Sequence, residues 1–283
     1  MSTAVRSREV VVDGIPLHVR DAGEGPALVL LHGLGASHAV WNDTIMAFRD
    51  RWRVVAPDLP GHGRSAKPRA PYTIDFYAGV VRSLGTVLGI DDAVVVGSSM
   101  GGLVATELAI WYPGWARALV LAAPAGVYPA AARGLGWVLD TLAGPSAVRF
   151  GLARNVRRCF YDPSSPGCLE RERILAERVA AEDFPAFVRA VTRSLAGVLA
   201  AERQALDVVT QPVLLVWGRE DRLVGLGGSA RLVRAIPHAR LAVIDACGHL
   251  PMLERPVEFN RLVADFLRAA DAAPRWHATR LSG

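Results

Sequence analysis

The sequence predicts an α/β fold in which a mostly parallel β-sheet carries helices on both faces. Three observations favour this class. Short apolar runs typical of strands buried on both faces recur along the 283 residues. Helical patterns separate most of these runs, and alternation of strand and helix is typical of a parallel sheet. Apolar residues make up 51% of the chain, which is enough to fill a substantial core.

The predicted sheet opens with an antiparallel pair. Two alternating runs between Arg8 and Asp21 flank Asp13-Gly14, a dipeptide that favours a two-residue hairpin turn. Six apolar runs then follow as predicted strands, at residues 27–31, 54–56, 93–96, 118–122, 213–217 and 241–244. Helical patterns cover residues 39–48, 75–88, 103–112, 229–235 and 256–270. The pattern therefore predicts eight strands.

One interval departs from this alternation. Between Val127 and about Thr210 no strand pattern occurs, whereas residues 135–142, 171–181 and 184–199 look helical and residues 162–167 look like a loop. We interpret residues 127–210 as a helical cap, or lid, inserted between two sheet strands; a separate helical domain is the alternative. The core domain would comprise residues 1–126 and 211–270, and residues 271–283 would form a flexible tail.

Composition excludes several classes of protein. Residues 1–9 lack the apolar stretch of a signal peptide, and the most apolar segment, residues 118–132, is shorter than a membrane-spanning helix and contains prolines. Three cysteines without C-x-x-C spacing fit a reducing compartment, so we expect a soluble, cytoplasmic protein. The net charge of +5 comes from arginines mostly interspersed with acids, and we expect no nucleic-acid partner. The histidines and acids lack ligand spacing, so neither a metal nor another cofactor is expected.

The pentapeptide Gly97-Ser98-Ser99-Met100-Gly101 lies where a predicted strand stops and a helix starts. A G-x-S-x-G pattern in this context holds a serine on a sharp turn. Ser99, unlike Ser98, has glycine two residues before and two residues after it, which allows strand and helix to pack closely around a strained backbone. Ser99 is therefore the candidate nucleophile.

A serine nucleophile needs a base, and histidine suits this role because its pKa lies near neutrality. In an open parallel sheet the site forms beyond the carboxyl ends of the strands. Of the seven histidines, His249 follows the last predicted strand, whereas His38 begins a helix and His238 precedes that strand. Asp221 follows the preceding strand and would orient the base; its neighbour Glu220 competes for this role on position alone.

Attack on a carbonyl creates an oxyanion that needs fixed N–H donors. The backbone N–H of Met100 would lie at the positive end of the helix after Ser99. The loop His32-Gly33-Leu34-Gly35 follows the third strand, and its flexible backbone offers the N–H of Leu34 as the second donor. Leu34 and Met100 are therefore the candidate oxyanion-hole residues.

With these residues, the chain resembles the α/β-hydrolase fold superfamily, in particular its lidded esterases and lipases. The resemblance spans nearly all of residues 10–270, and its motifs are residues 32–33, 58–65, 97–101, 218–221 and 248–249. It implies that Ser99, Asp221 and His249 form a catalytic triad, and it favours Asp221 over Glu220. It also implies that His62 is not catalytic.

From this resemblance we expect a serine hydrolase that cleaves a carboxylic ester through an acyl-enzyme intermediate, with a small-molecule ester or related acyl compound as substrate. A carbon–carbon bond hydrolase of meta-cleavage-product type is an alternative, because residues 97–102 and 258–262 also resemble those enzymes. Such enzymes commonly place tryptophan where this chain has Leu250. A thioesterase and, from another class, a non-catalytic ligand receptor on the same fold are further alternatives.

Two sets of cap residues are candidates for substrate contact. The aromatic set would supply an apolar wall, or simply pack the cap: Trp137, Phe150, Phe160, Tyr161, Phe184 and Phe187. The basic set would meet an acidic group of the substrate, or form a solvated helix face: Arg149, Arg154, Arg157 and Arg158. The sequence leaves both choices open.

Overall fold

A computed structural model describes residues 4–126, 145–201 and 205–272 and contains the predicted eight-stranded sheet. Its strands are β1 (Arg6–Val12), β2 (Ile15–Ala22), β3 (Ala27–Leu31), β4 (Arg53–Pro57), β5 (Ala93–Ser98), β6 (Ala116–Ala122), β7 (Val213–Gly218) and β8 (Ala239–Ile244). The spatial order is β1-β2-β4-β3-β5-β6-β7-β8. The pairs β1–β2 and β2–β4 are antiparallel and all other pairs are parallel. The mostly parallel sheet and its opening hairpin are thus confirmed.

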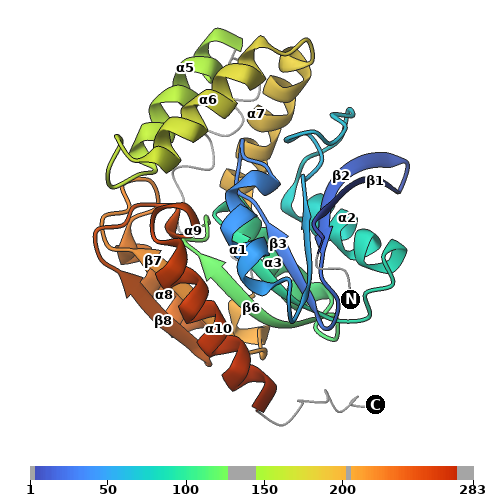
Figure 1. The fold of residues 1–283 in the computed structure, drawn as a ribbon, viewed down its shortest axis with the longest axis vertical. Helices are drawn as coiled ribbons and strands as arrows, with labels where there is room; N and C mark the ends of the chain where they lie inside the picture. Colours follow the sequence, from blue (N-terminus) through green and yellow to red (C-terminus); the bar gives the residue numbers. More distant parts are fainter. Residues whose placement is uncertain (1–3, 127–144, 202–204, 273–283) are drawn as a thin grey trace.

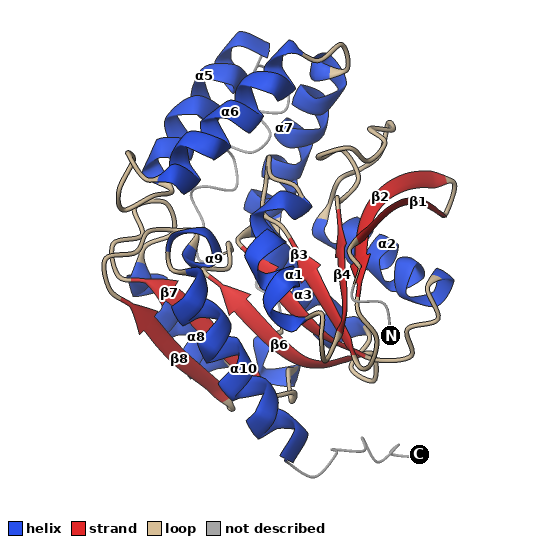
Figure 2. Cartoon of the chain, in the orientation of Figure 1, coloured by secondary structure: helices blue, strands red, loops and turns tan. Residues whose placement is uncertain are grey.

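Helices cover both faces of this sheet (Figure 2). On one face lie α2 (Ile74–Val87), α3 (Met100–Trp111) and α8 (Ser229–Ala235); on the other lie α1 (Asn42–Phe48), the short α9 (Pro251–Glu254) and α10 (Pro256–Ala272). Alternate side chains of β3 enter opposite cores: Val29 packs with the α2 and α3 side, and Leu28 with the α1 and α10 side. Burial on both faces explains why the strands read as continuous apolar runs rather than as alternating ones.

Three further helices follow β6 in the chain and gather at one end of the molecule, at the top of Figure 1. They are α5 (Pro145–Arg158), α6 (Pro166–Ala180) and α7 (Phe184–Ala200). Strand β7 then returns to pair directly with β6, Leu119 opposite Val213. The predicted helix at 135–142 and the tail at 273–283 lie outside the described residues. That residues 127–210 form a cap stays a prediction.

Local signals explain where two of these helices begin. Helix α6 starts five residues before the predicted pattern, because Ser165 accepts a hydrogen bond from the N–H of Cys168 and Pro166 occupies the first turn. Helix α3 starts at Met100, immediately after Ser99, rather than at residue 103. Within the described ranges, no helix is both long and apolar enough to cross a membrane.

Candidate active site

Ser99 occupies a strained turn between β5 and α3. Its backbone lies at φ 53° and ψ −116°, which residues with a side chain rarely adopt. The two glycines of the motif are explained by close approach of the backbone. A Cβ on Gly97 would lie 2.2 Å from the carbonyl oxygen of Gly101, and a Cβ on Gly101 would lie 2.2 Å from that of Leu31. The turn therefore exists only because both positions lack a side chain.

This crowding predicts how substitution of a glycine changes the free energy of unfolding. We expect Gly101→Ala to lower the free energy of unfolding by about 3 kcal/mol or more, because the new methyl group meets backbone rather than a movable side chain. Gly79→Ala, in the middle of α2 with nothing within 4 Å of the added Cβ, should instead raise it by about 0.5–1 kcal/mol. Urea unfolding followed by circular dichroism measures both. Equal midpoints for Gly101→Ala and the wild type would refute the packing explanation.

His249 and Asp221 lie together at the carboxyl ends of neighbouring strands. His249 follows β8 and Asp221 follows β7, and His249 Nδ1 lies 2.7 Å from Asp221 Oδ2. Both side chains are almost completely buried, at 3% and 0% exposure. The other oxygen, Asp221 Oδ1, accepts the N–H groups of Leu223 and Val224 at 2.8 and 2.9 Å. These bonds orient the carboxylate, which in turn directs Nε2 of His249 away from it.

The structure separates Asp221 from its competitor Glu220. Glu220 Oε2 accepts a hydrogen bond from the N–H of Cys247 at 3.0 Å and so holds the loop that carries His249. Among the described residues, the only carboxylate bonded to the ring of His249 is that of Asp221. Adjacent residues thus have distinct contacts, which their positions in the sequence alone did not reveal.

Ser99, His249, Leu34 and Met100 all line one cavity of about 360 Å³. His249 Nε2 is buried without a hydrogen-bond partner among the described residues. No hydrogen bond joins it to Ser99 within that part of the chain, a separation that ligand-free active sites often show. A Cβ on Gly33 would lie 3.1 Å from Cβ of Ser99, so the loop bearing Leu34 packs directly beside the serine. The first N–H of α3, on Met100, has no acceptor within its own helix.

Helices α5, α6 and α7 form the other wall of the cavity. Their lining residues are mainly apolar and include Leu152, Val156, Ile174, Leu175, Phe187, Val191, Leu195 and Val198, and Phe160 joins them from the segment between α5 and α6. Of the predicted aromatic set, Phe160 and Phe187 therefore line the cavity. Phe150 and Tyr161 are 73% and 43% exposed, Phe184 stacks on Phe187, and Trp137 lies outside the described residues.

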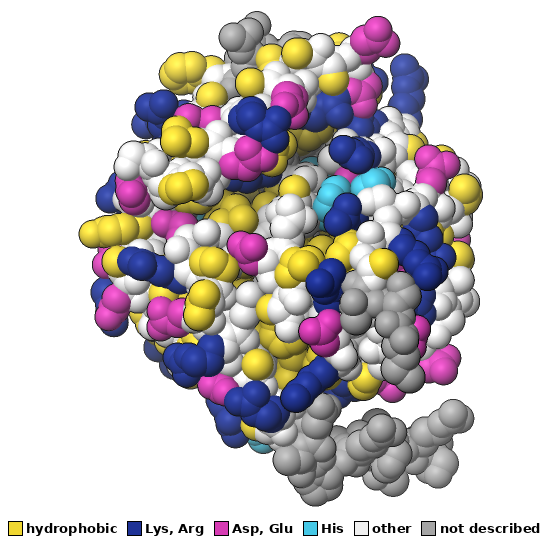
Figure 3. Space-filling view, viewed as in Figure 1, with side chains coloured by type: hydrophobic (Ala, Val, Ile, Leu, Met, Phe, Trp, Pro, Cys, Tyr) yellow, Lys and Arg dark blue, Asp and Glu magenta, His cyan; other side chains and the backbone are white. Residues whose placement is uncertain are grey.

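The basic residues that face the cavity are not those singled out from the sequence. Arg154, Arg157 and Arg158 are exposed on α5, where Arg157 pairs with Glu172, and the side chain of Arg149 lies outside the described set. On the face of the molecule in Figure 3, basic and acidic side chains are interspersed. The arginines in the cavity wall are instead Arg171 and Arg178 of α6. Their spacing of seven residues, two helical turns, was the signal that could have identified them.

A backbone connection joins the loop of His249 to the end of α5. The N–H of His249 donates to the carbonyl oxygen of Cys159 at 2.6 Å. The carboxylate of Glu254 accepts the N–H of Gly248 at 2.8 Å and the N–H of Tyr161 at 2.7 Å. A Cβ on Gly248 would lie 2.5 Å from the oxygen of Cys159, so the two segments are in tight contact.

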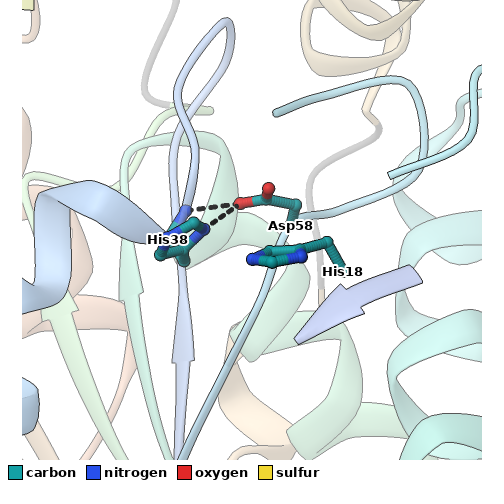
Figure 4. Close-up of side chains that lie close together, drawn as sticks. All are labelled: His18, His38 and Asp58. Atoms are coloured by element: carbon teal, nitrogen blue, oxygen red, sulfur yellow. Dashed lines mark hydrogen bonds and ion pairs between the residues drawn. The ribbon is translucent and has the colours of Figure 1, made fainter. Parts of the chain in front are cut away.

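His18, His38 and Asp58 lie close together (Figure 4). Each of the three side chains offers an atom that could bind a metal ion, and these atoms lie within 4.8 Å of one another. Within the described part of the chain, this is the group with that property. They come from three separate segments, so their spacing in the sequence could not reveal them. Asp58 Oδ1 accepts the N–H of His38 at 2.6 Å and lies 2.8 Å from His38 Nδ1. Asp58 Oδ2 accepts the N–H of Arg64 at 2.8 Å.

These contacts explain what Asp58 does. Burial opposes ionisation of its carboxyl group, but the hydrogen bond and charge of His38 lower its pKa to about 2. N–H donors already occupy both carboxylate oxygens, so the cluster does not fit a metal ion well. We interpret Asp58 as the group that ties the Leu34 loop to the loop after β4.

Two other histidines near the loop have structural contacts. His32 Nε2 accepts the N–H of Leu59 at 2.9 Å, and burial lowers the pKa of His32 to about 4. Burial also lowers the pKa of His62 to about 3, and its Nδ1 lies 3.0 Å from the carbonyl oxygen of Pro60. Neither side chain lines the cavity, which leaves His249 as its only histidine among the described lining residues.

Comparison with known proteins identifies a family model and relatives that this chain resembles. The family model described as alpha/beta hydrolase fold matches residues 26–256. The 2-hydroxymuconate semialdehyde hydrolase of Pseudomonas sp. strain CF600 is 31% identical over 277 residues, which cover 94% of this chain and 95% of that protein.

Solved structures show the same similarity. A meta-cleavage product hydrolase from Pseudomonas fluorescens IP01 superposes with a TM-score of 0.79 at 27% identity, covering 94% of this chain and 98% of that one. The enol-lactonase from Burkholderia xenovorans LB400 superposes with a TM-score of 0.78 at 26% identity, covering 92% and 100%. Proteins similar to this chain thus include enzymes named for different hydrolytic reactions.

Proposed function

The chain belongs to the alpha/beta hydrolase family, and from this premise we propose that it is a serine hydrolase that cleaves a carboxylic ester through an acyl-enzyme intermediate. The observation that supports the proposal most is the buried pair of His249 and Asp221, 2.7 Å apart, in the same cavity as the strained Ser99. A serine, an oriented histidine and backbone N–H donors are what acyl transfer to water requires.

Each residue has a defined role in this mechanism. Ser99 Oγ attacks the ester carbonyl while His249 Nε2 takes its proton. The N–H groups of Leu34 and Met100 donate hydrogen bonds to the oxyanion. His249 then gives the proton to the departing alcohol, and in the second half it activates water to release the acid. Asp221 keeps His249 in the required tautomer and stabilises the imidazolium.

An ester is favoured by the proton-transfer groups in the cavity. The alkoxy group of an ester leaves as the alcohol when protonated His249 donates one proton to its oxygen. Hydrolysis of a carbon–carbon bond additionally requires protonation of a carbon atom before or during cleavage. Among the described lining residues, His249 is the one side chain of histidine, aspartate or glutamate type. One such group is sufficient for the ester reaction.

Carbon–carbon bond hydrolysis is the second candidate function, and the relatives favour it. Both the 2-hydroxymuconate semialdehyde hydrolase and the meta-cleavage product hydrolase match this chain over more than nine tenths of its length. The same three residues would serve, with His249 also moving the additional proton. Leu250, which lines the cavity directly after His249, is where such enzymes commonly carry tryptophan.

Relative turnover distinguishes the two reactions. Purified protein is offered p-nitrophenyl acetate, butyrate and octanoate in parallel with a dienoate ring-cleavage product, and kcat/KM is measured for each. We expect burst release of p-nitrophenolate followed by steady ester turnover. No ester turnover together with rapid loss of the dienoate absorbance would replace the first proposal with the second.

A further inference from the structure

The backbone on both sides of His249 is held by the carboxylate of Glu254, the last residue of α9. The N–H of Gly248 donates to Glu254 Oε1 at 2.8 Å. The backbone of Leu250, on the other side of His249, is a further hydrogen-bond donor to the same carboxylate. The N–H of His249 itself donates to the carbonyl oxygen of Cys159 at 2.6 Å. Three consecutive N–H groups therefore have acceptors, and one carboxylate serves two of them.

Glu254 also reaches the opposite wall of the cavity. Its second oxygen, Oε2, accepts the N–H of Tyr161 at 2.7 Å. Phe160 and Cys159, directly before Tyr161, line the cavity together with His249. The half-buried carboxylate thus fixes the backbone of the candidate base against the segment that follows α5.

These bonds supply what the side chain of Asp221 cannot. Asp221 fixes one end of the His249 ring, at Nδ1. The direction of the other end, Nε2, also depends on where the backbone of His249 lies. Proton transfer is sensitive to this placement, because a shift of about 1 Å can lower a rate by about 10²-fold. Glu220 bonds only to the N–H of Cys247, two residues before the base.

The charge of Glu254 is not explained by stability of the fold. Burial raises the pKa of its carboxyl group, although the N–H groups of Tyr161, Gly248 and Leu250 and the charge of Arg255 act in the opposite direction. A raised pKa means that folding favours the neutral carboxyl group over the carboxylate. Such a conflict is typical of residues kept for function.

The groups packed around Glu254 change charge little on the acid side. Arg255, the neighbouring cation, also donates to the carbonyl oxygen of Ala246 at 3.1 Å. Guanidinium groups stay protonated and thiols stay neutral in acid. The thiols that interact with Glu254 come from the loop of His249, the segment after α5, and α6: Cys247, Cys159 and Cys168. The other carboxylates facing the loop of His249 belong to Asp221 and Glu220.

We propose that Glu254 is a positioning residue for the candidate base: its ionised carboxylate holds the backbone of residues 248–250 so that His249 Nε2 can reach Ser99, and its protonation releases them. The proposal rests on the proposed function and adds to it a second ionisation that governs activity in acid. Catalysis then requires a neutral His249 and a charged Glu254.

The variant Glu254→Gln tests the positioning role. An amide of the same shape has one N–H₂ group in place of an acceptor oxygen, so it cannot accept from both Gly248 and Tyr161. We expect kcat for p-nitrophenyl butyrate at mildly alkaline pH to fall by about 10–100-fold, with KM changed by less than about threefold. Glu254→Asp, which keeps both acceptor oxygens, should recover part of this loss. Glu258→Gln, the same change at an exposed position of α10, should have no effect.

The pH profile distinguishes positioning from a purely structural role. In the wild type, log kcat/KM should fall in acid with a slope approaching about 2, because both His249 and Glu254 take up protons. In Glu254→Gln the slope should be about 1, whereas Glu220→Gln should keep the slope of the wild type. Active sites are counted by titration with a fluorophosphonate probe. A purely structural residue would change the Tm and the fraction of active protein, but neither kcat per titrated site nor the slope.

The outcomes separate this inference from the proposed function. If the wild type hydrolyses no ester, the proposed function fails, and the rate constant for labelling of Ser99 by the fluorophosphonate, compared between the wild type and Glu254→Gln across the same pH range, decides the role of Glu254. If the two proteins share kcat and slope, the ester reaction stands and the positioning role is refuted. Absence of both turnover and labelling in the wild type would overturn both proposals.

Discussion

Ser99→Ala is expected to lower kcat for a p-nitrophenyl ester by about 10⁴-fold or more, because the variant lacks the hydroxyl that forms the acyl-enzyme in the proposed mechanism. Binding should persist, since the cavity wall is unchanged. Initial-rate kinetics with active-site titration by a fluorophosphonate probe measure both the loss of turnover and the loss of covalent labelling.

The control for this variant is Ser98→Ala. Ser98 precedes the nucleophile, is buried and also lines the cavity, but it lacks the strained turn. It should keep most of the activity and the full stoichiometry of labelling. If Ser99→Ala and the wild type hydrolyse esters at equal rates, the protein is not a serine hydrolase at this site, and a ligand receptor on the same fold becomes the better interpretation.

Asp221→Asn is expected to lower kcat by about 10⁴-fold while the fold is retained. An amide at this position offers an N–H where His249 Nδ1 requires an acceptor, so the ring is held in the wrong tautomer or is not held. The loss should appear in kcat rather than in KM. Steady-state kinetics with the ester that the wild type turns over fastest provide the measurement.

Glu220→Gln is the matched variant, because it makes the same chemical change one residue earlier. Its amide can still accept the hydrogen bond from the N–H of Cys247 through the carbonyl oxygen, so we expect no more than a few-fold change in kcat. Should Glu220→Gln be the more damaging of the two variants, the assignment of Asp221 as the partner of His249 would be wrong.

The sheet was predictable because its strands are buried on both faces. Runs such as Ala93 to Val96 have one interpretation when helical patterns flank them, and β5 was predicted to within two residues. The candidate nucleophile and base were predictable for a topological reason. The ends of parallel strands meet at one edge of the sheet, so position after a strand favours His249. His32 also follows a strand, and only the structure shows that its side chain does not line the cavity.

The cavity wall was less predictable, because it depends on which way each helical side chain faces. The arginines of α5 stand out in the sequence by density, yet the described ones face solvent, whereas Arg171 is surrounded by acids in the sequence and faces the cavity. Similarly, the position of Asp58 beside His38 depends on tertiary contact between separate loops. Such pairings have no local signature.

The contact between Cys159 and His249 limits how a substrate can reach Ser99. Because the end of α5 is hydrogen-bonded to the loop of the candidate base, and Glu254 fastens both segments, a hinge cannot open there without displacing His249. Substrate must therefore enter the cavity, and product leave it, along a different side of α5, α6 and α7. Glu254 therefore holds the loop of the candidate base and the segment after α5 in a fixed relation to each other, whichever side of the cavity admits the substrate.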